Sequence, residues 1–225
     1  MAESKDYNRD KVGDNDVEEY DEKELRGLKE KLVVFGGRGS VGKTSMFRYY
    51  YEGRKDDLYL TQKYETYFGI SVYSYKDSGK KIWIAYDDHE GGGEDWYRVH
   101  YRGYEWADVV VLCYSIGYRN SFKEIEEYWH SFVQKYAPKA AIILCATKTD
   151  LRKDLEFIKE RKNEWNEELV TTLEGKQMAE KIGALGFYEC STYDEEGVKE
   201  VFEAAAEATL YGKSSEKKHS RCRIM

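Results

Sequence analysis

Residues 31–52 read KLVVFGGRGSVGKTSMFRYYYE, and this stretch decides the fold. Its apolar run at residues 32–35 predicts a strand buried on both faces, as strands of a parallel sheet are. A glycine-rich turn follows, and residues 43–52 are expected to form a helix. A buried strand, a glycine turn and a helix in this order predict an α/β unit with a binding site at the turn.

The turn at residues 37–44, GRGSVGKT, matches the phosphate-loop pattern G-x-x-x-x-G-K-[ST]. Its glycines let successive N–H groups face phosphate oxygens, and the helix N-terminus adds its dipole. Lys43 is expected to reach the β- and γ-phosphates, and the Thr44 hydroxyl to ligate Mg²⁺. The loop therefore predicts a bound nucleoside triphosphate.

The rest of the chain alternates strands with helices. A hairpin is expected at residues 67–86, and buried strands are expected at 109–114, 140–145 and 187–190. Helical stretches are expected at about 120–136, 154–166, 172–183 and 195–210. This order predicts a three-layer α/β fold with a six-stranded, mostly parallel sheet that is antiparallel only at the edge strand of the hairpin. Ligands of such sheets bind beyond the carboxyl ends of the strands.

Length and charge predict one domain with two tails. The 225 residues, 41% of them hydrophobic, suffice for one core. Residues 1–30 hold eleven acidic and six basic residues, whereas residues 212–225 hold five basic and one acidic. We expect a disordered acidic extension at 1–29, a domain at 30–211 and a basic tail at 212–225. No apolar run is long enough to span a membrane, and the first residues lack the apolar core of a secretory signal.

A base-reading motif is expected at residues 147–150, TKTD, directly after a buried strand. The Asp150 carboxylate is able to accept hydrogen bonds from N1 and N2 of guanine, and adenine lacks this pair of donors. The Lys148 stem is able to cover one face of the ring. Alone, the motif is also compatible with an ordinary strand-to-helix turn. Its place about 105 residues after the phosphate loop favours guanine.

In these motifs the chain resembles the Ras superfamily of small GTPases, and the Rho branch is the best match. Rho members typically read T-K-L-D-L-R where residues 147–152 read TKTDLR. They also carry an extra charged helix, which residues 153–168 resemble, and residues 189–192, ECST, match the fifth nucleotide motif. The resemblance covers about residues 30–225 and implies a P-loop GTPase fold with a Rho-type insert helix.

The resemblance also implies a set of site residues for GTP or GDP with Mg²⁺. Implied catalytic positions are Lys43, Thr44 and Gly93, and implied metal ligands are Thr44, Thr61 and Asp87. Arg38, at a variable loop position, points either outward or to the γ-phosphate as an internal arginine finger. The implied nucleotide contacts are Gly37, Gly39, Ser40, Val41, Gly42, Lys43, Thr44, Ser45, Thr147, Lys148, Asp150, Leu151, Ser191 and Thr192.

The first switch segment departs from the family pattern. Either Thr61 or Gln62 stands where the family has its Mg²⁺-binding threonine, and a one-residue insertion favours Thr61. If Gln62 stands there, the contact to the metal and the γ-phosphate is weakened. Lys55 aligns with the aromatic residue that stacks on guanine, so this stack is either lost or supplied by Tyr51 or Tyr59.

The second switch segment departs further. Asp87 retains the metal position, but three glycines follow at residues 91–93. The glutamine that positions the attacking water is absent, and Gly93 stands in its place. Because glycine neither positions water nor neutralises charge, slow or absent hydrolysis is predicted. His89 and Glu90 are either replacements for the glutamine or solvated loop side chains.

The final residues, CRIM, match a prenylation signal in which the terminal methionine favours farnesyl on Cys222. One prenyl chain anchors weakly, and the basic residues before it are able to add attraction to anionic lipid. This combination indicates a membrane surface rather than nucleic acid. The cysteine spacing indicates a reduced chain.

Two functions stay open. The first is a monomeric guanine-nucleotide switch that hydrolyses GTP slowly at the cytoplasmic face of a membrane, with the plasma membrane expected. The second is a GTPase-deficient signalling scaffold that stays loaded with GTP. A small-molecule kinase leaves Asp150 and the prenylation signal unexplained. The resemblance implies effector proteins, exchange factors and activating proteins as partners, and a link to the actin cytoskeleton.

Overall fold

A computed structural model describes residues 29–52, 68–74, 81–88 and 104–210, with side chains at 31–50 and 104–210. The sheet has six strands in the order β2-β3-β1-β4-β5-β6. Every neighbouring pair is parallel except β2 with β3, so the predicted mixed sheet is confirmed. The strands are β1 (Lys29–Gly36), β2 (Phe68–Ser74), β3 (Lys81–Asp88), β4 (Val109–Ser115), β5 (Ala141–Thr147) and β6 (Gly186–Glu189).

The described helices match the predicted stretches to within a few residues. A π-helical turn, η1 (Ile125–Trp129), joins two helices into one continuous segment, and a 3-10 turn, η2 (Thr149–Arg152), follows β5. The α-helices are α2 (Lys43–Glu52), α4 (Arg119–Glu124), α5 (His130–Tyr136), α6 (Leu155–Trp165), α7 (Thr172–Lys181) and α8 (Val198–Ala208).

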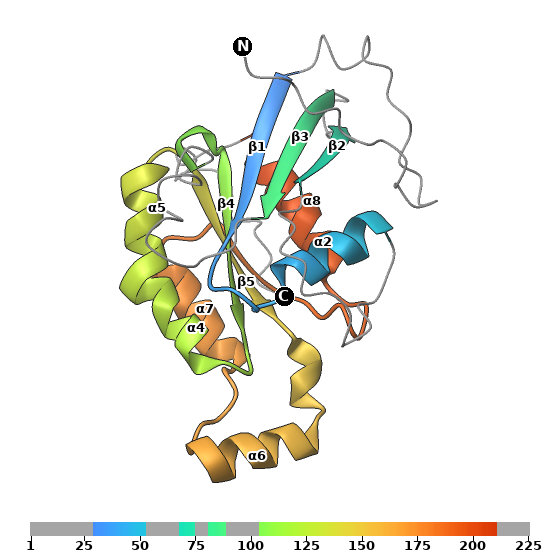
Figure 1. The fold of residues 1–225 in the computed structure, drawn as a ribbon. Helices are drawn as coiled ribbons and strands as arrows, with labels where there is room; N and C mark the ends of the chain where they lie inside the picture. The colour runs from blue at the N-terminus through green and yellow to red at the C-terminus, as the bar shows by residue number, and fades with distance from the viewer. Residues whose placement is uncertain (1–28, 53–67, 75–80, 89–103, 211–225) are drawn as a thin grey trace, which may run out of the picture.

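Helices cover both faces of the sheet (Figure 1). On one face α2 and α8 pack around Phe35, Phe47 and Phe202, whose ring centroids lie 4.9 to 5.3 Å apart. On the other face the α4–α5 segment and α7 pack on the sheet, with Trp129 and Phe132 buried between them. Every residue of β4 and β5 is buried. This explains why both strands read as unbroken apolar runs.

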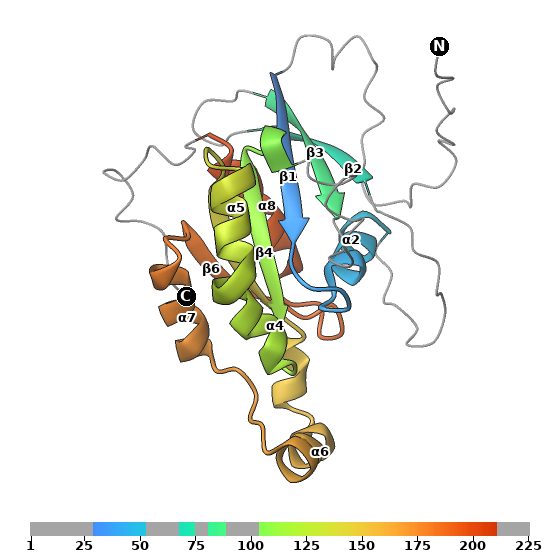
Figure 2. The same cartoon turned by 60° about the vertical axis from the view of Figure 1, so that its left-hand side comes forward.

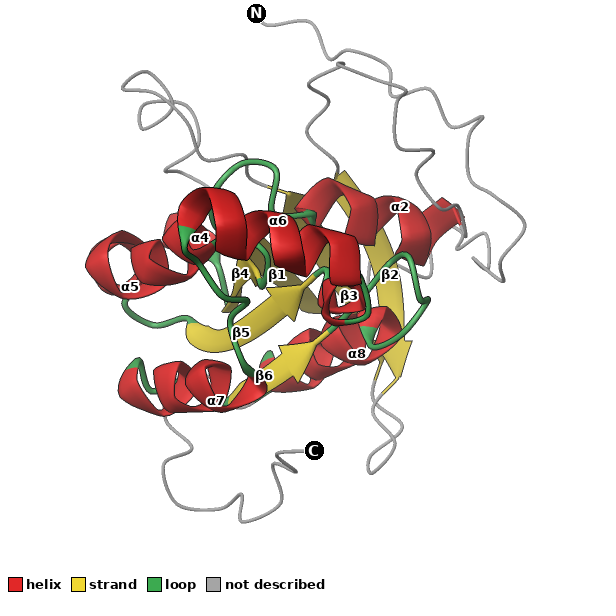
Figure 3. Cartoon of the chain, turned by 90° about the horizontal axis from the view of Figure 1, so that it is seen from below, coloured by secondary structure: helices red, strands yellow, loops and turns green. Residues whose placement is uncertain are grey.

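The insert helix α6 lies apart from both layers. Figure 2 shows it beyond the carboxyl ends of the strands, at the lower end of the domain, and Figure 3, seen from below, shows it in front of the sheet. None of its residues is buried. The Asp154 side chain caps it by accepting the N–H of Phe157 at 2.9 Å. Within the helix, Arg161 lies 5.5 Å from the ring centroid of Trp165, and it pairs with Glu167 beyond the helix end.

Two further predictions concern the cysteines and the membrane. The described cysteines Cys113, Cys145 and Cys190 are free and buried. Within the described ranges, every helix is too short or too polar to cross a bilayer. The extension at 1–28 and the tail from 211 to 225, including Cys222, lie outside the described residues.

Candidate functional site

The phosphate loop joins β1 to α2 and has the backbone shape that the sequence predicts. Gly37 has φ 133°, Ser40 has φ 62° and Gly42 has φ 106°. A Cβ on Gly37 would lie 2.3 Å from the carbonyl oxygen of Cys113, so only glycine fits where the loop crosses β4. Backbone turns of this kind point N–H groups into an anion-binding concavity.

Lys43 is the charged centre of this loop. Its side chain is 3% exposed, and its ammonium donates to the carbonyl oxygens of Gly37 at 3.3 Å and Arg38 at 3.2 Å. No carboxylate of the described residues forms an ion pair with it. A buried cation without a counter-charge is costly, and a bound phosphate group supplies that charge. The loop therefore fits the predicted anionic ligand.

The base-reading motif is tied directly to the phosphate loop. The Thr147 hydroxyl is hydrogen-bonded to the carbonyl of Val41 and lies 3.0 Å from that of Tyr114. Lys148 has φ 58°, and its ammonium donates to the carbonyl of Ser40 at 2.9 Å. Lys148 as a whole is exposed, but loss of water around its ammonium lowers the pKa of Lys148. The negative charge of Asp150 acts in the opposite direction and raises this pKa by less. The two motifs thus form one continuous surface.

Asp150 is oriented by Ser191, which sequence analysis named only as an implied nucleotide contact. The fully buried Ser191 hydroxyl donates to Oδ1 of Asp150 at 2.6 Å. The same hydroxyl accepts the N–H groups of Tyr193 at 3.1 Å and Asp194 at 3.0 Å. Within the described residues, the Asp150 carboxylate forms no other hydrogen bond or ion pair. Its remaining lone pairs are available to the two donors on a guanine edge.

A second interaction that sequence reasoning missed fixes the same corner of the sheet. Arg152 forms a two-pronged ion pair with Glu189, with nitrogen–oxygen distances of 2.6 and 3.2 Å. The Thr172 hydroxyl adds contacts of 3.1 Å to both carboxylate oxygens. This pair joins η2, which carries Asp150, to β6, which leads into Ser191. In the sequence, the only signal for this interaction was that Arg152 matches the arginine of the family pattern at residues 147–152.

Arg38 points away from the loop. Its guanidinium pairs with Glu124 of α4 and lies 5.3 Å from the ring centroid of Tyr118. These contacts match the outward alternative and not an arginine finger. The π-helical turn η1 begins directly after Glu124. The phosphate loop is therefore joined through Arg38 to the helical segment that leads toward α5.

The remaining predicted site residues are placed as follows. Thr44 and Ser45 lie in the first turn of α2, and Thr192 follows Ser191 in a half-buried position. Leu151 belongs to η2, and its side chain packs beside Gly117. Asp87 lies near the end of β3, paired in register with Val34, and its side chain is not described. Outside the described residues lie Lys55, Tyr59, Thr61, Gln62, His89, Glu90 and Gly93; the side chain of Tyr51 is likewise not described.

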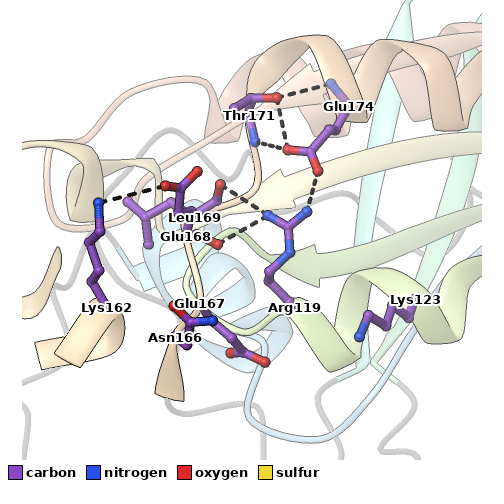
Figure 4. A pocket seen from close by; sticks show the side chains of 9 residues that line it. All are labelled: Arg119, Lys123, Lys162, Asn166, Glu167, Glu168, Leu169, Thr171 and Glu174. Carbon is purple, nitrogen blue, oxygen red and sulfur yellow. Dashed lines mark hydrogen bonds and ion pairs between the residues drawn. The ribbon is translucent and has the colours of Figure 1, made fainter. Parts of the chain in front are cut away.

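A polar cavity of about 620 Å³ lies between α4, α6 and α7 and does not belong to this site (Figure 4). At its centre, Arg119 pairs with Glu174 and donates to the carbonyls of Glu168 and Leu169 at 3.0 and 3.2 Å. None of the phosphate-loop or base-motif residues lines it. These bonds hold the insert against the body of the domain.

Comparison with known proteins agrees with this geometry. The Ras family model matches residues 31–211. The GTP-binding protein RHO1 of Saccharomyces cerevisiae is 34% identical over 208 residues, which cover 88% of this chain and 96% of RHO1. The RHO1 protein of Candida albicans is 33% identical over 198 residues, with the same coverage of 88% and 96%. The phosphate loop, the oriented Asp150 and these matches together establish that the chain belongs to the Ras family and is a Rho-like small GTPase.

Proposed function

We propose that this protein is a guanine-nucleotide switch that binds GTP and GDP with Mg²⁺ and hydrolyses GTP slowly. One observation carries the proposal. The Ser191 hydroxyl aims Asp150 while Lys148 reaches the Ser40 carbonyl, so one rigid surface presents a base-reading carboxylate beside a phosphate cradle. Members of the Ras family hydrolyse GTP. We propose that this protein does so slowly because glycine replaces the water-positioning glutamine of the second switch segment at residue 93.

Recognition of guanine by Asp150 is tested by replacing a hydrogen-bond acceptor of its side chain with a donor. Asp150→Asn replaces one carboxylate oxygen by an amino group, so it should weaken GDP binding and strengthen binding of xanthosine diphosphate. The wild type should bind GDP far more tightly than ADP in calorimetric titrations. Asp154→Asn is the matched control, because asparagine caps a helix as well as aspartate does. Equal affinities for GDP and ADP would contradict the proposal.

Mg²⁺ fits the residues proposed to hold it, because hydroxyl and carboxylate oxygens are its preferred ligands. Thr44 in α2, Asp87 in β3 and Thr61 are the proposed ligands. The bound ion would neutralise charge on the β- and γ-phosphates. We expect chelation with EDTA to accelerate GDP release. In Thr44→Ala, EDTA should accelerate GDP release much less than in the wild type, whereas in Ser45→Ala the effect of EDTA should be unchanged.

Slow hydrolysis is proposed from Gly93. Single-turnover hydrolysis of GTP should be slow for the wild type and faster for Gly93→Gln, since glutamine is able to orient the attacking water. An inert wild type that the variant activates would favour the alternative function, a scaffold that stays loaded with GTP. An ordinary rate in the wild type would mean that another group, first His89 or Glu90, positions the water.

Signalling at a membrane is proposed through a prenyl group on Cys222 and the basic residues of 212–225. We expect the wild type to partition into membranes of cells that prenylate it, at the cytoplasmic face of the plasma membrane. Cys222→Ser should release it, and membrane retention of this variant would refute the anchor. Effector proteins, exchange factors and activating proteins are the proposed partners, with cytoskeletal effectors first, and a monomer is the proposed state.

A further inference from the structure

The site proposed for the nucleotide lies at the carboxyl ends of the parallel strands, and other segments form the opposite end of the domain. Residues 104–108 lead into β4, and residues 137–140 lead into β5. The N–H of Ala141 donates to the carbonyl of Asp108 at 2.9 Å, so these two segments lie side by side. Figure 1 shows this end at the top of the domain, away from the phosphate loop.

The segment before β4 is held firmly against the sheet. The Asp108 carboxylate pairs with Lys31 and accepts the N–H of Leu32 at 3.0 Å. The N–H of Asp108 donates to the carbonyl of Leu32 at 2.9 Å. Tyr104, at the start of the segment, is fully buried. The backbone on both sides of Trp106 is therefore fixed by the fold.

The Trp106 side chain takes no part in this packing. It is 76% exposed, which is more than the other exposed large apolar side chains of the described residues. Within the same part of the chain, no hydrogen bond, ion pair or ring contact involves its indole. Single exposed apolar side chains are common and by themselves indicate no role. The position of Trp106 relative to the C-terminal tail gives the exposure a meaning.

The tail leaves the domain at the same end as Trp106. Helix α8 begins beside the carboxyl end of β6, where a Cβ on Gly197 would lie 2.1 Å from the carbonyl oxygen of Glu189. Figure 1 shows α8 running from there back toward the upper end of the sheet. Leu210, which is 47% exposed, follows the helix, and residues 212–225 then carry five basic residues and one acidic residue.

We propose that Trp106 is a membrane contact of the domain, with its indole packed into the headgroup region of the anionic bilayer to which the tail binds. This inference rests on the membrane anchor of the proposed function. Tryptophan favours this region because it combines an apolar ring with a polar N–H group. Lys139, exposed two residues before β5, adds a positive charge on the neighbouring segment, and the exposed Glu105 adds a negative one. Most of the attraction to anionic lipid therefore comes from the tail.

This contact would determine which end of the domain faces the lipid. A prenyl group on Cys222 attaches the chain at one point, twelve positions beyond Leu210. A single prenyl group anchors weakly, so an additional apolar contact increases membrane affinity as well as orienting the domain. With Trp106 in the headgroup region, the amino ends of the strands face the bilayer.

The first measurement is vesicle affinity. The full chain is farnesylated at Cys222 with farnesyl diphosphate and a farnesyltransferase, and it is sedimented with vesicles of phosphatidylcholine and phosphatidylserine. Trp106→Ala should bind about ten-fold more weakly, because this factor corresponds to burial of about 60 Å² of ring surface, roughly a third of what an aromatic side chain is able to bury. Trp106→Phe retains an apolar ring and should bind nearly as the wild type does. Trp165→Ala is the matched control, because it removes an indole that is 62% exposed on α6, beyond the other end of the strands.

The second measurement is contact of the indole with lipid. Vesicles with bromine near the headgroup end of the acyl chains quench the fluorescence of tryptophans that reach this depth. Among the five tryptophans of the chain, Trp106 should account for most of the quenching. Trp106→Phe should therefore lose it while still binding, and Trp165→Phe should retain it. Because Trp106 is mostly exposed and lies away from the nucleotide site, thermal midpoints and GDP affinities should stay near those of the wild type.

The outcomes separate this inference from the function on which it rests. Wild-type vesicle affinity in Trp106→Ala, or undiminished quenching in Trp106→Phe, overturns the inference while the prenyl anchor stands. Self-association in the absence of vesicles that Trp106→Ala abolishes would assign the side chain to a contact with a second copy, and it too overturns the inference. If the transferase leaves Cys222 unmodified, the proposed anchor is refuted, and the inference with it.

Discussion

Replacing Ser191 by alanine removes a hydroxyl that donates to Asp150 at 2.6 Å and accepts two backbone N–H groups. A hydrogen bond to a charged group contributes about 1.5–3 kcal/mol. The two N–H groups lie in a loop whose exposed residues give them access to water, so their loss costs about 0.5 kcal/mol each. We expect Ser191→Ala to lower the free energy of unfolding by about 2.5–4 kcal/mol.

A loss of stability would be expected whether Ser191 orients Asp150 or only packs in the core. The decisive quantity is therefore the relative affinity for two nucleotides that differ in their base. On the proposed function, the 2-amino group of guanine donates to the Asp150 carboxylate. A bond of about 1.5–3 kcal/mol should then make GDP bind about 10- to 150-fold more tightly than inosine diphosphate (IDP), which lacks this group. Without the Ser191 hydroxyl, Asp150 rotates more freely. The ratio of the two dissociation constants should then fall at least about three-fold.

The matched control is Ser121→Ala. Ser121 is 1% exposed, its hydroxyl donates to the carbonyl of Tyr118 at 2.6 Å and it accepts the N–H of Ser115 at 3.1 Å. This variant should also lose stability in urea titrations, yet it should retain the wild-type ratio in calorimetry because it does not touch Asp150. If Ser191→Ala retained the wild-type ratio of the dissociation constants for IDP and GDP, Ser191 would not orient Asp150, whatever the effect of the substitution on stability.

Three further variants test other contacts. Gly175→Ala should gain about 1 kcal/mol of helix propensity, but its Cβ would lie 2.3 Å from the Phe187 ring and 2.5 Å from the Tyr114 hydroxyl, both buried. Overpacking costs about 1–3 kcal/mol, so the urea midpoint should fall, and a rise would show that the rings yield. Arg38→Ala removes a partly exposed ion pair and should cost at most about 1 kcal/mol while GDP release accelerates modestly; unchanged release would show that α4 does not restrain the loop. Burial alone would raise the pKa of Glu174, but hydrogen bonds from the helix cap and an arginine of α4 hold it below its ordinary value. Its stabilisation is therefore present at neutral pH and is lost as the pH falls below about 4. Glu174→Gln should be less stable than the wild type at pH 7 and converge with it in acid, and a constant difference in urea midpoint would contradict this assignment.

The parts of the fold that sequence predicted are those with strong local signals. Residues 37–44 define a backbone loop through glycine spacing alone, and the structure gives Gly37 and Gly42 the positive φ values this loop needs. The strands β4 and β5 were visible because burial on both faces favours apolar residues at every position before the final Ser115 and Thr147. The insert helix at 153–168 was visible through its charge pattern and the family resemblance.

The missing parts are contacts between residues far apart in the chain. Ser191 and Asp150 are 41 positions apart, and Arg152 and Glu189 are 37 apart. No periodicity relates such pairs, because the pairing of β5 with β6 creates their proximity. The π-helical turn η1 was equally invisible, since residues 119–136 read as one helix whether its turns hold four or five residues.

Nucleotide binding and hydrolysis depend on differently constrained parts of this protein. Lys43, Thr147 and Ser191 are 3%, 2% and 0% exposed, so the groups proposed to hold the nucleotide are also part of the folded core. Substitution of Thr147 or Ser191 should therefore cost stability as well as affinity, because each hydroxyl forms hydrogen bonds inside the fold. Gly93 contributes no side chain to either, so hydrolysis is able to decline while binding persists. The two proposed functions, the slow switch and the GTP-loaded scaffold, therefore use the same fold and the same proposed nucleotide contacts, and comparing GTP hydrolysis by the wild type and by Gly93→Gln distinguishes them.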